Sequence, residues 1–444
     1  METEQNTNGM DPSTTVLIVG AGPTGLFLAL RLARAGIRTV VFEQDAELLP
    51  TPRALGYFGP TQFALQHAGI WEEVRDQGYL LKGLSWRKIT QETSPGYRGW
   101  GDLIASWDLT QGSASREGEC GYGMTILGQH RLREIIMSKL AASRLAQVYF
   151  GHKVVAVTQD DHSASVDVTV LDQQGGQRSF RGSYLVAADG GKSTVRKLLA
   201  LPLEGITWPQ VLVATDTWAD IPLPSDGPPF VYIVNPVDWA LFSPIQRPCE
   251  HGPSYYRITV PMAREQCEPD VLDWNLKQKL ERLLPGPRPA KYEVVRSQRY
   301  ETHQRVVPSM ISGRCMLIGD AAHLNNPWGG LGLSTGLLDA DSLADALTYV
   351  LGQGLSASIL RRWADARREV FLKIVNPISS ANKLRCHDTD PDNPSSDPFF
   401  KMLRKEDNEQ ELQDLMCSMA EMATDVSQFI EDQAQPPGNP PHAS

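Results

Sequence analysis

The spacing of apolar positions changes period several times along the chain, and each change predicts a change of secondary structure. Near the start, an apolar run at 16–19 leads into a glycine-rich turn and an apolar stretch with helical spacing, and a second strand covers 38–42. The same two periods later predict helices at about 61–77 and 128–144 and buried strands at 184–190 and 316–319. Strands that alternate with helices in this way favour an α/β fold.

Residues 203–295 have a different character, because proline and tryptophan are frequent and the strands are short and alternating. The strands are predicted at 211–215, 230–234, 239–245 and 255–260, with a hairpin turn at 235–238. The layout therefore predicts an α/β domain interrupted twice by a smaller, mainly antiparallel β-sheet domain. Their predicted bounds are 1–80, 121–202 and 296–385 for the first domain, and 81–120 and 203–295 for the second.

The C-terminal region, residues 386–444, is predicted as a helical extension of these domains. Residues 386–397 are polar and rich in proline and aspartate, as expected for a linker. Apolar residues at helical spacing within 402–430 predict one amphipathic helix, which either docks on its own domain or forms a dimer contact. Residues 433–444 predict a disordered tail.

Composition excludes several classes of function. The formal net charge of −10, with no long basic run, argues against a nucleic-acid surface. The 6 cysteines show no CxxC pair and no metal-ligand spacing, which predicts free thiols and no metal site. The first 15 residues are polar, unlike a signal peptide, and no apolar stretch is long enough to span a membrane. We therefore expect a soluble cytoplasmic protein, either a monomer or a homodimer.

One motif points to a particular ligand chemistry. The strand at 16–19 leads into Gly20, Gly22 and Gly25, and Glu43 follows at the end of the next strand. Gly20 permits the tight turn, Gly22 lets the backbone approach a pyrophosphate, and Gly25 lets the helix pack closely on the strand. The helix start presents unpaired N–H groups to the phosphates, and Glu43 can accept a hydrogen bond from a ribose hydroxyl. The unit predicts a dinucleotide-binding site.

Two later stretches narrow the choice of dinucleotide. Residues 187–196 contain Gly-Lys-Ser, but Val186 stands where a P-loop needs its first glycine, so that interpretation fails. Residues 315–339 place Asp320 at the end of a strand, before a glycine-rich loop and a helix that begins near Ser334. This arrangement offers a carboxylate to polyol hydroxyls and a second helix N-terminus to an anionic ring edge.

The three motifs together resemble those of the single-component, FAD-dependent class A flavoprotein monooxygenases of the p-hydroxybenzoate hydroxylase and salicylate hydroxylase type. The resemblance covers roughly residues 14–380. It implies a Rossmann-like FAD-binding domain interrupted by a substrate-binding β-sheet domain. It also implies FAD as cofactor, NADPH or NADH as a transient reductant and O2 as co-substrate. Since the sequence has no second GxGxxG motif, the choice between NADH and NADPH stays open.

The resemblance assigns cofactor contacts in the first half of the chain. It implies that the glycines of the turn hold the pyrophosphate and that Glu43 binds the adenosine ribose. Arg53 would contact FAD beside the mobile flavin, and Gln129 would lie near the ribityl chain. Asp189 would shape the cofactor site, with Arg196 closing its motif.

The resemblance also assigns contacts to the flavin. Asp320 would bind the ribityl hydroxyls, and Pro327 with the loop at 329–333, which includes Gly330, would run along the isoalloxazine. The backbone N–H groups of Leu333 and Ser334 would face its anionic N1/C2-oxygen edge. In the same stretch, His323 is interpreted as packing behind the loop. Trp328 departs from the family pattern, and either walls the flavin pocket or packs within the loop.

Candidates for substrate contact lie on the predicted strands of the second domain. Tyr232 alternates with apolar neighbours, and Trp239, Tyr256 and Arg257 lie on nearby strands. An arginine beside a tyrosine would stabilise a phenolate or carboxylate and lower its pKa. Tyr232, Arg257 and Pro327 are therefore the candidate catalytic residues, with an ordinary role in the sheet as the alternative for the first two.

The implied reaction is a monooxygenation. NAD(P)H reduces the flavin, O2 adds to give a C4a-hydroperoxide, and one oxygen atom enters an electron-rich aromatic substrate. A phenolic or polyketide-like compound of secondary metabolism is the expected substrate. The same chemistry also serves epoxidation, dearomatising hydroxylation and Baeyer–Villiger oxidation. A flavin-dependent reductase or dehydrogenase without oxygen insertion is a second alternative. A non-catalytic flavin-binding scaffold is a third, which the intact motifs at 189–196 and 319–320 disfavour.

Overall fold

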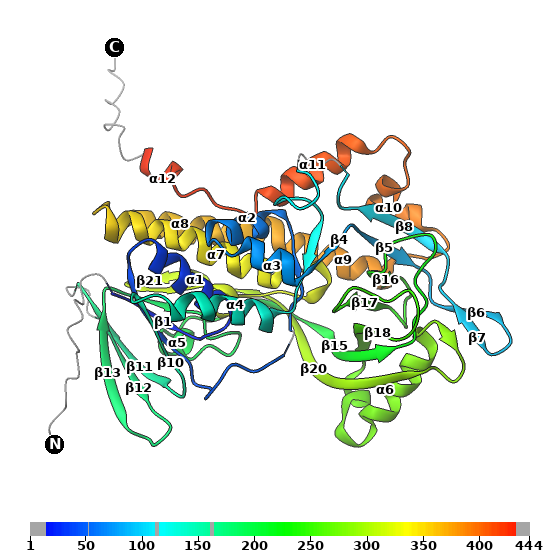
Figure 1. Cartoon of the computed structure of the whole chain (residues 1–444), viewed down its shortest axis with the longest axis horizontal. Coiled ribbons are helices and arrows are strands. Elements are labelled where there is room, and N and C mark those ends of the chain that lie inside the picture. The colour runs from blue at the N-terminus through cyan, green and yellow to red at the C-terminus, as the bar shows by residue number, and fades with distance from the viewer. Residues whose placement is uncertain (1–14, 52, 112–114, 160–163, 432–444) are drawn as a thin grey trace, which may run out of the picture.

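Two large β-sheets lie side by side along the long axis of the molecule, and helices from the C-terminal half run above both of them (Figure 1). The computed structural model describes residues 15–51, 53–111, 115–159 and 164–431. The polar N-terminal stretch up to residue 14 and the predicted tail at 433–444 lie outside these ranges. Among the described helices, none has the length and apolar character needed to cross a membrane.

The first sheet is six-stranded, in the order β10-β2-β1-β14-β22-β21, and only β21 runs antiparallel to its neighbour. Its strands are β1 (Thr15–Val19), β2 (Arg38–Phe42), β10 (Ala146–Tyr149), β14 (Tyr184–Ala187), β21 (Ile311–Ser312) and β22 (Cys315–Leu317). Strands of a parallel sheet are covered on both faces, so their sequences are continuous apolar runs. Here the covering elements are helices on one side and a small antiparallel sheet, β11 (Lys153–Gln159), β12 (Val166–Leu171) and β13 (Gln177–Gly182), on the other (Figure 1).

The second sheet is eight-stranded and mainly antiparallel, as predicted, in the order β23-β20-β15-β18-β17-β16-β5-β8. Its strands are β5 (Gly83–Arg87), β8 (Leu103–Asp108), β15 (Glu204–Ala219), β16 (Val231–Ile233), β17 (Ala240–Pro244), β18 (Ser254–Met262), β20 (Tyr292–Val306) and β23 (His323–Leu324). β20 crosses the predicted boundary at 295/296, and the domain bounds stay a prediction. Short strands form two further sheets, from β3 (Gly56–Tyr57), β4 (Tyr79–Leu81) and β9 (Met124–Ile126), and from β6 (Gln91–Ser94), β7 (Tyr97–Gly99) and β19 (Gly286–Pro287).

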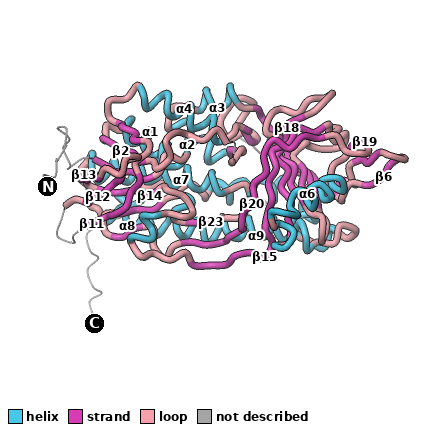
Figure 2. Tube along the Cα trace, turned by 90° about the horizontal axis from the view of Figure 1, so that it is seen from below, coloured by secondary structure: helices cyan, strands magenta, loops and turns pink. Residues whose placement is uncertain are grey.

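The two faces of the eight-stranded sheet have different neighbours. One face buries apolar side chains such as Val213, Phe242 and Ile258 against α6 (Pro269–Leu283), which supplies Leu276 and Leu280 to the same core (Figure 2). Successive side chains of a strand point to opposite faces. The intervening residues of β15, β17 and β18 therefore point away from α6, toward the interior of the molecule.

The described helices agree with the sequence prediction after the first glycine turn, near 128–144 and at the start near 334, differ from it at 61–77 and within 402–430, and elsewhere lie at positions for which no bounds were predicted. They are α1 (Pro23–Arg34), α2 (Gly59–His67), α3 (Trp71–Gln77), α4 (Gln129–Ala141), α5 (Thr194–Leu198), α6, α7 (Gly332–Leu347), α8 (Ser358–Val370), α9 (Asn376–Asp388), α10 (Pro398–Leu403), α11 (Glu409–Ala420) and α12 (Gln428–Glu431). The helix predicted at 61–77 is broken into α2 and α3, because Gly69 adopts a positive φ of 62° just after α2 ends.

The C-terminal region also differs from its prediction. The helix expected within 402–430 is two separate helices, α11 and α12, because the Met422 backbone carbonyl accepts a hydrogen bond from Arg367 instead of continuing the helix. The expected linker at 386–397 begins inside α9 and ends at Asp397, whose carboxylate caps the start of α10. Apolar spacing encodes neither the long-range contact of Arg367 with Met422 nor the local cap by Asp397.

Candidate active site

The glycine turn between β1 and α1 has the geometry of a dinucleotide cradle. Gly20 has a φ of 104°, and a Cβ there would lie 2.4 Å from the Ala188 carbonyl oxygen. A Cβ on Gly25 would lie 2.1 Å from the Gly20 carbonyl oxygen, so α1 packs directly on the turn. At Gly22 the nearest atom to such a Cβ is 3.9 Å away, and the residue lines an internal cavity. The turn thus leaves room for a phosphate at Gly22.

Two carboxylates border this turn. The Ala21 amide donates to Glu43 Oε2 at 2.8 Å, which fixes Glu43 at the end of β2 beside the turn. Asp189 Oδ2 accepts from the backbone amides of Thr194 and Val195 at 2.7 and 3.2 Å, at the start of α5. The other oxygen of Asp189, Oδ1, is buried without a protein hydrogen-bond partner. A buried carboxylate oxygen of this kind needs a donor, such as a ligand hydroxyl or a water molecule.

Arg196 connects the Asp-Gly motif to the Gly-Asp motif. Its side chain is buried and donates to the Ala321 carbonyl at 2.9 Å and to the Gly191 carbonyl at 2.8 Å. Asp320 follows β22 at this point, with its carboxylate facing the open cavity. Its place inside the molecule raises the pKa of Asp320, although the nearby charges of His323 and Arg53 act in the opposite direction.

The loop after Asp320 ends in the N-terminus of α7. The first backbone amide with an acceptor inside the helix is that of Thr335, which donates to the Leu331 carbonyl at 2.8 Å. The preceding amides, including those of Leu333 and Ser334, lie in the first turn, where helical N–H groups have no intrahelical acceptor. Leu333 lines the cavity, whereas the Ser334 side chain is buried within the helix packing. Only the backbone of Ser334 is therefore suited to the role predicted for it.

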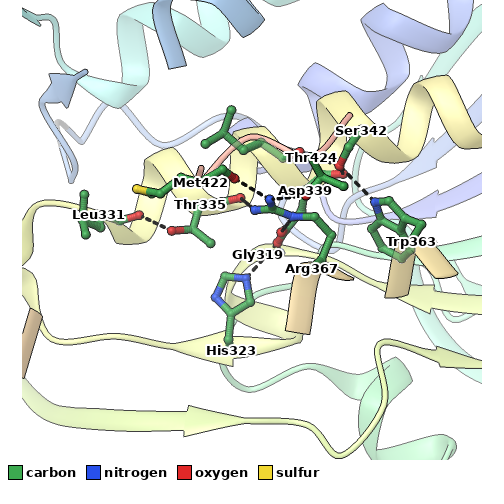
Figure 3. A network of polar contacts seen from close by, with 11 residues as sticks. Gly319, His323, Leu331, Thr335, Asp339, Ser342, Trp363, Arg367, Met422 and Thr424 are labelled. Carbon is green, nitrogen blue, oxygen red and sulfur yellow. Dashed lines mark hydrogen bonds and ion pairs between the residues drawn. The ribbon is translucent and has the colours of Figure 1, made fainter. Parts of the chain in front are cut away.

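A buried ionic network holds this loop from behind (Figure 3). The Asp339 carboxylate accepts from the Gly319 amide at 3.0 Å, from His323 Nε2 at 2.8 Å and from Arg367 Nε at 2.7 Å. Arg367 also donates to the Met422 carbonyl at 2.5 Å and to Thr424 Oγ1 at 3.1 Å. Burial pushes the pKa of Asp339 up, but the charges of Arg367 and His323 hold it below its ordinary value. His323 thus faces Asp339, in agreement with the packing role predicted for it.

Strand register places aromatic side chains together on one face of the eight-stranded sheet. On the face turned away from α6, Trp86, Tyr232 and Leu241 are direct cross-strand neighbours. The Trp86 and Tyr232 rings are stacked, with centroids 5.2 Å apart. The Tyr232 hydroxyl donates to the Trp328 carbonyl at 3.1 Å, which joins the sheet to the loop. Burial raises the pKa of Tyr232 far above its ordinary value, so the phenol stays neutral.

Arg257 lies on the same face, but its charge is already paired. Its Nε and Nη2 contact Asp216 Oδ1 at 2.8 and 2.7 Å, and Nη1 donates to the Arg53 carbonyl. Tyr256 is a candidate from the sequence together with Arg257, but adjacent residues on a strand face opposite ways, and Tyr256 is buried in the core with α6. Trp239 lies outside the cavity and packs on Trp328 at 4.4 Å. Trp328 itself is fully buried within the loop packing.

One cavity of about 1200 Å³ brings most of the predicted residues together. The predicted residues that line it are Gly20, Gly22, Glu43, Arg53, Gln129, Asp189, Tyr232, Arg257, Asp320, Pro327, Gly330 and Leu333. Gly25 and Ser334 do not line it, because Gly25 packs under the turn and Ser334 within α7. Residues that the sequence analysis missed also line it, among them Trp107, Phe399, Leu415 and Met419.

These residues fit FAD. The turn at Gly22 and the first turns of α1 and α7 offer backbone N–H groups to anionic parts of a ligand. Glu43, Asp320 and the unpaired oxygen of Asp189 offer acceptors to sugar and ribityl hydroxyls. Acceptors for hydroxyls and donors for anions line one continuous cavity, which is the combination that a flavin dinucleotide requires.

Comparison with known proteins agrees with this geometry. The family model described as FAD binding domain matches residues 13–377. The chain is 34% identical over 384 residues to para-nitrophenol 4-monooxygenase of Pseudomonas sp. (strain WBC-3), covering 86% of this chain and 89% of that protein. It is also 34% identical to 6-hydroxy-3-succinoylpyridine 3-monooxygenase of Pseudomonas putida, covering 84% of this chain and 89% of that protein.

Solved structures give the same result. The crystal structure of p-nitrophenol 4-monooxygenase from Pseudomonas putida DLL-E4 superposes with a TM-score of 0.80 at 31% identity, covering 92% of this chain and 98% of the other. A ternary complex of aklavinone-11 hydroxylase with FAD and aklavinone has a TM-score of 0.70 at 26% identity, covering 85% and 70%. The chain belongs to the FAD binding domain family, as one of its FAD- and NAD(P)H-dependent monooxygenases.

Proposed function

We propose that this enzyme hydroxylates a small phenol. In the balanced reaction, one oxygen atom of O2 enters a ring C–H bond, and the other leaves as water with two electrons from NAD(P)H. The observation that carries the proposal is the aromatic face of Trp86 and Tyr232, which lines the same cavity as the loop between Pro327 and Leu333. An apolar chamber beside a flavin site supplies the dry, oriented environment that oxygen transfer needs.

Specific residues would hold the cofactor. The turn at Gly22 would receive the pyrophosphate, Glu43 the adenosine ribose and Asp320 the ribityl hydroxyls. The α7 amides of Leu333 and Ser334 would face the anionic edge of the flavin ring. When bound, FAD accepts a hydride from NAD(P)H and provides the oxygen-activating chemistry. Arg53, Gln129, Asp189, Pro327 and Gly330 line the same cavity and would complete the cofactor site.

Tyr232 and Arg257 are the proposed substrate-contacting residues. The Tyr232 hydroxyl already donates to Trp328, so its oxygen is left to accept a hydrogen bond from a substrate hydroxyl. Arg257 is held by Asp216 on the cavity face, and its remaining N–H groups would donate to a phenolate oxygen, which favours the ionised form of the phenol. An ionised phenol is more electron-rich, and therefore accepts an oxygen atom more readily.

The relatives favour a single-ring phenol. The para-nitrophenol and pyridine monooxygenases are 34% identical to this chain, whereas aklavinone-11 hydroxylase is 26% identical. The shared chemistry would extend to a polyketide-like substrate if the chamber admitted several fused rings. A place in secondary metabolism stays a prediction.

The test begins with the visible spectrum of the purified protein, followed by NADH and NADPH oxidation under air with a panel of phenols. We expect a yellow protein whose nicotinamide oxidation is stimulated by one class of phenol and yields a product one oxygen atom heavier. Nicotinamide consumption without an oxygenated product would contradict the proposal. It would instead favour a flavin reductase.

A matched pair of variants tests the assigned face of the sheet. Tyr232→Phe should lower substrate-stimulated oxidation by about three- to tenfold, the order expected for one hydrogen bond. Tyr256→Phe should leave it unchanged, because Tyr256 faces α6 and its hydroxyl has no protein partner. Equal effects of both variants would remove Tyr232 from the site.

A further inference from the structure

The C-terminal segment contributes side chains to the active-site cavity. The match to the FAD binding domain family ends at residue 377. Beyond that point, Phe399 of α10 and Leu415 and Met419 of α11 line the same cavity as Tyr232. One wall of the chamber is therefore supplied from outside the residues that the FAD binding domain model matches.

Phe399 closes the chamber against the aromatic face of the sheet. Its ring meets Trp86 edge-on at 5.4 Å and Trp107 edge-on at 6.1 Å. Trp86 is in turn stacked on Tyr232. Phe399 therefore contacts a ring that is itself in contact with Tyr232, the proposed substrate-contacting residue. Phe400, the next residue, also meets the Trp86 ring edge-on at 5.8 Å, but it is fully buried and does not line the cavity.

α11 extends this wall toward the flavin loop. Leu415 and Met419 lie four positions apart and so share one face of the helix. Met419 also lines a small adjoining cavity with Phe58. The Phe58 ring lies 3.6 Å from the position that a Cβ on Gly330 would occupy. The Phe58 side chain therefore connects the neighbourhood of Met419 on α11 with the loop at Gly330.

The wall is fixed at both ends by charged side chains of α8 and α9. At one end, Arg385 donates to Asp397 at 3.0 Å and lies 4.2 Å above the Phe399 ring centroid. At the other end, Arg367 binds the Met422 carbonyl and Thr424, and is itself held by Asp339 behind the Asp320 loop (Figure 3). The segment between these ends is therefore a fixed wall of the cavity.

We propose that Phe399, Leu415 and Met419 are specificity-determining residues, which set the size of the aromatic substrate that the chamber admits. This proposal rests on the proposed function. Apolar walls discriminate by fit, and one methylene group in a hydrophobic pocket changes kcat/KM by roughly 10- to 200-fold. Because these three residues lie outside the residues that the family model matches, substitutions at them can change the size of the chamber without changing a residue proposed to hold FAD.

Two pairs of variants test the proposal. Phe399→Leu and Met419→Ala each replace a cavity-lining side chain by a smaller one, which enlarges the chamber. Phe400→Leu and Met402→Ala make the same changes at positions of α10 that line neither of these two cavities. For each FAD-loaded protein, kcat/KM is measured for p-nitrophenol and for phenols with substituents of increasing size. The dissociation constants of the same phenols are measured by quenching of tryptophan fluorescence.

We expect the preference for bulky over small phenols to rise by about tenfold in Phe399→Leu and in Met419→Ala. It should stay at the wild-type value in both control variants, and FAD content should be the same in all. Equal preferences in the cavity-facing and control variants would overturn the inference. If the wild type oxidises no phenol, the proposed function fails, while the binding constants still decide whether this wall selects ligands by size.

Discussion

Replacing Arg367 with methionine perturbs the buried network that supports the flavin loop. Arg367 and Asp339 are both fully buried, and their ion pair is 2.7 Å long. The substitution leaves the Asp339 carboxylate with only His323 and the Gly319 amide, and removes the donor to the Met422 carbonyl. Breaking a buried pair by removing one partner destabilises a protein by about 3–5 kcal/mol. We expect a loss of that order in the free energy of unfolding.

The assay is urea unfolding followed by tryptophan fluorescence, with Arg368→Met as the control. Arg368 is the next residue on α8, is half-buried, and donates one hydrogen bond to the Val307 carbonyl at 3.0 Å. Loss of one such bond accounts for only about 1 kcal/mol. If Arg367→Met were no more destabilising than Arg368→Met, the argument that this network supports the fold would be refuted.

Acid adds a second test of the same network. Although burial acts to raise it, the pKa of Asp339 in the folded protein is held below its ordinary value by Arg367 and His323. The stabilisation is therefore complete above the unfolded value of about 3.9 and is lost as pH falls through the lower folded pKa. The stability difference between the wild type and Asp339→Asn should shrink over that acidic range and stay constant above it.

Three further predictions concern other sites. Asp320→Asn should weaken FAD binding by about 10- to 100-fold, because a hydrogen bond to a charged group contributes about 1.5–3 kcal/mol. Equilibrium dialysis measures the affinity for FAD, and an unchanged affinity would remove Asp320 from the site. Arg257→Ala should reduce phenol-stimulated NAD(P)H oxidation while FAD stays bound, and unchanged turnover would exclude Arg257 as a substrate contact. Burial lowers the pKa of Lys383 to about 8. Below its ordinary pKa, protonation of Lys383 is therefore less favourable in the folded protein than in the unfolded chain. The stability of the wild type relative to Lys383→Met, measured by urea unfolding, should therefore rise between about pH 8 and pH 10.4; a difference that stays constant over this range would contradict this.

The cofactor half of the site could be predicted from sequence because each motif is local. Gly20 is needed for its positive φ of 104°, and Gly25 is needed where a Cβ would strike the carbonyl oxygen of Gly20 in the same turn. Asp320 and the start of α7 lie within one strand–loop–helix unit. Requirements of this kind are met by residues close together along the chain, so a short pattern is enough to identify them.

The substrate half depended on strand register and on distant segments. Tyr256 and Arg257 are equally plausible in the sequence, but a difference of one position sends them to opposite faces of β18. The partnership of Asp339 with Arg367 joins two helices, and Asp339 is one of three aspartates in α7, so the sequence alone does not single it out.

By itself, the sequence determined the α/β fold, the dinucleotide turn and the class of cofactor, because these follow from local conformation and from the period of apolar positions. Only the tertiary structure decided which residues enclose the chamber. Phe399 and Met419 reach Trp86 and Phe58 from more than 300 positions along the chain, through packing and through the anchors at Arg385 and Arg367. Contacts between such distant segments arise from the way whole faces pack together, and spacing along the chain carries no direct record of them.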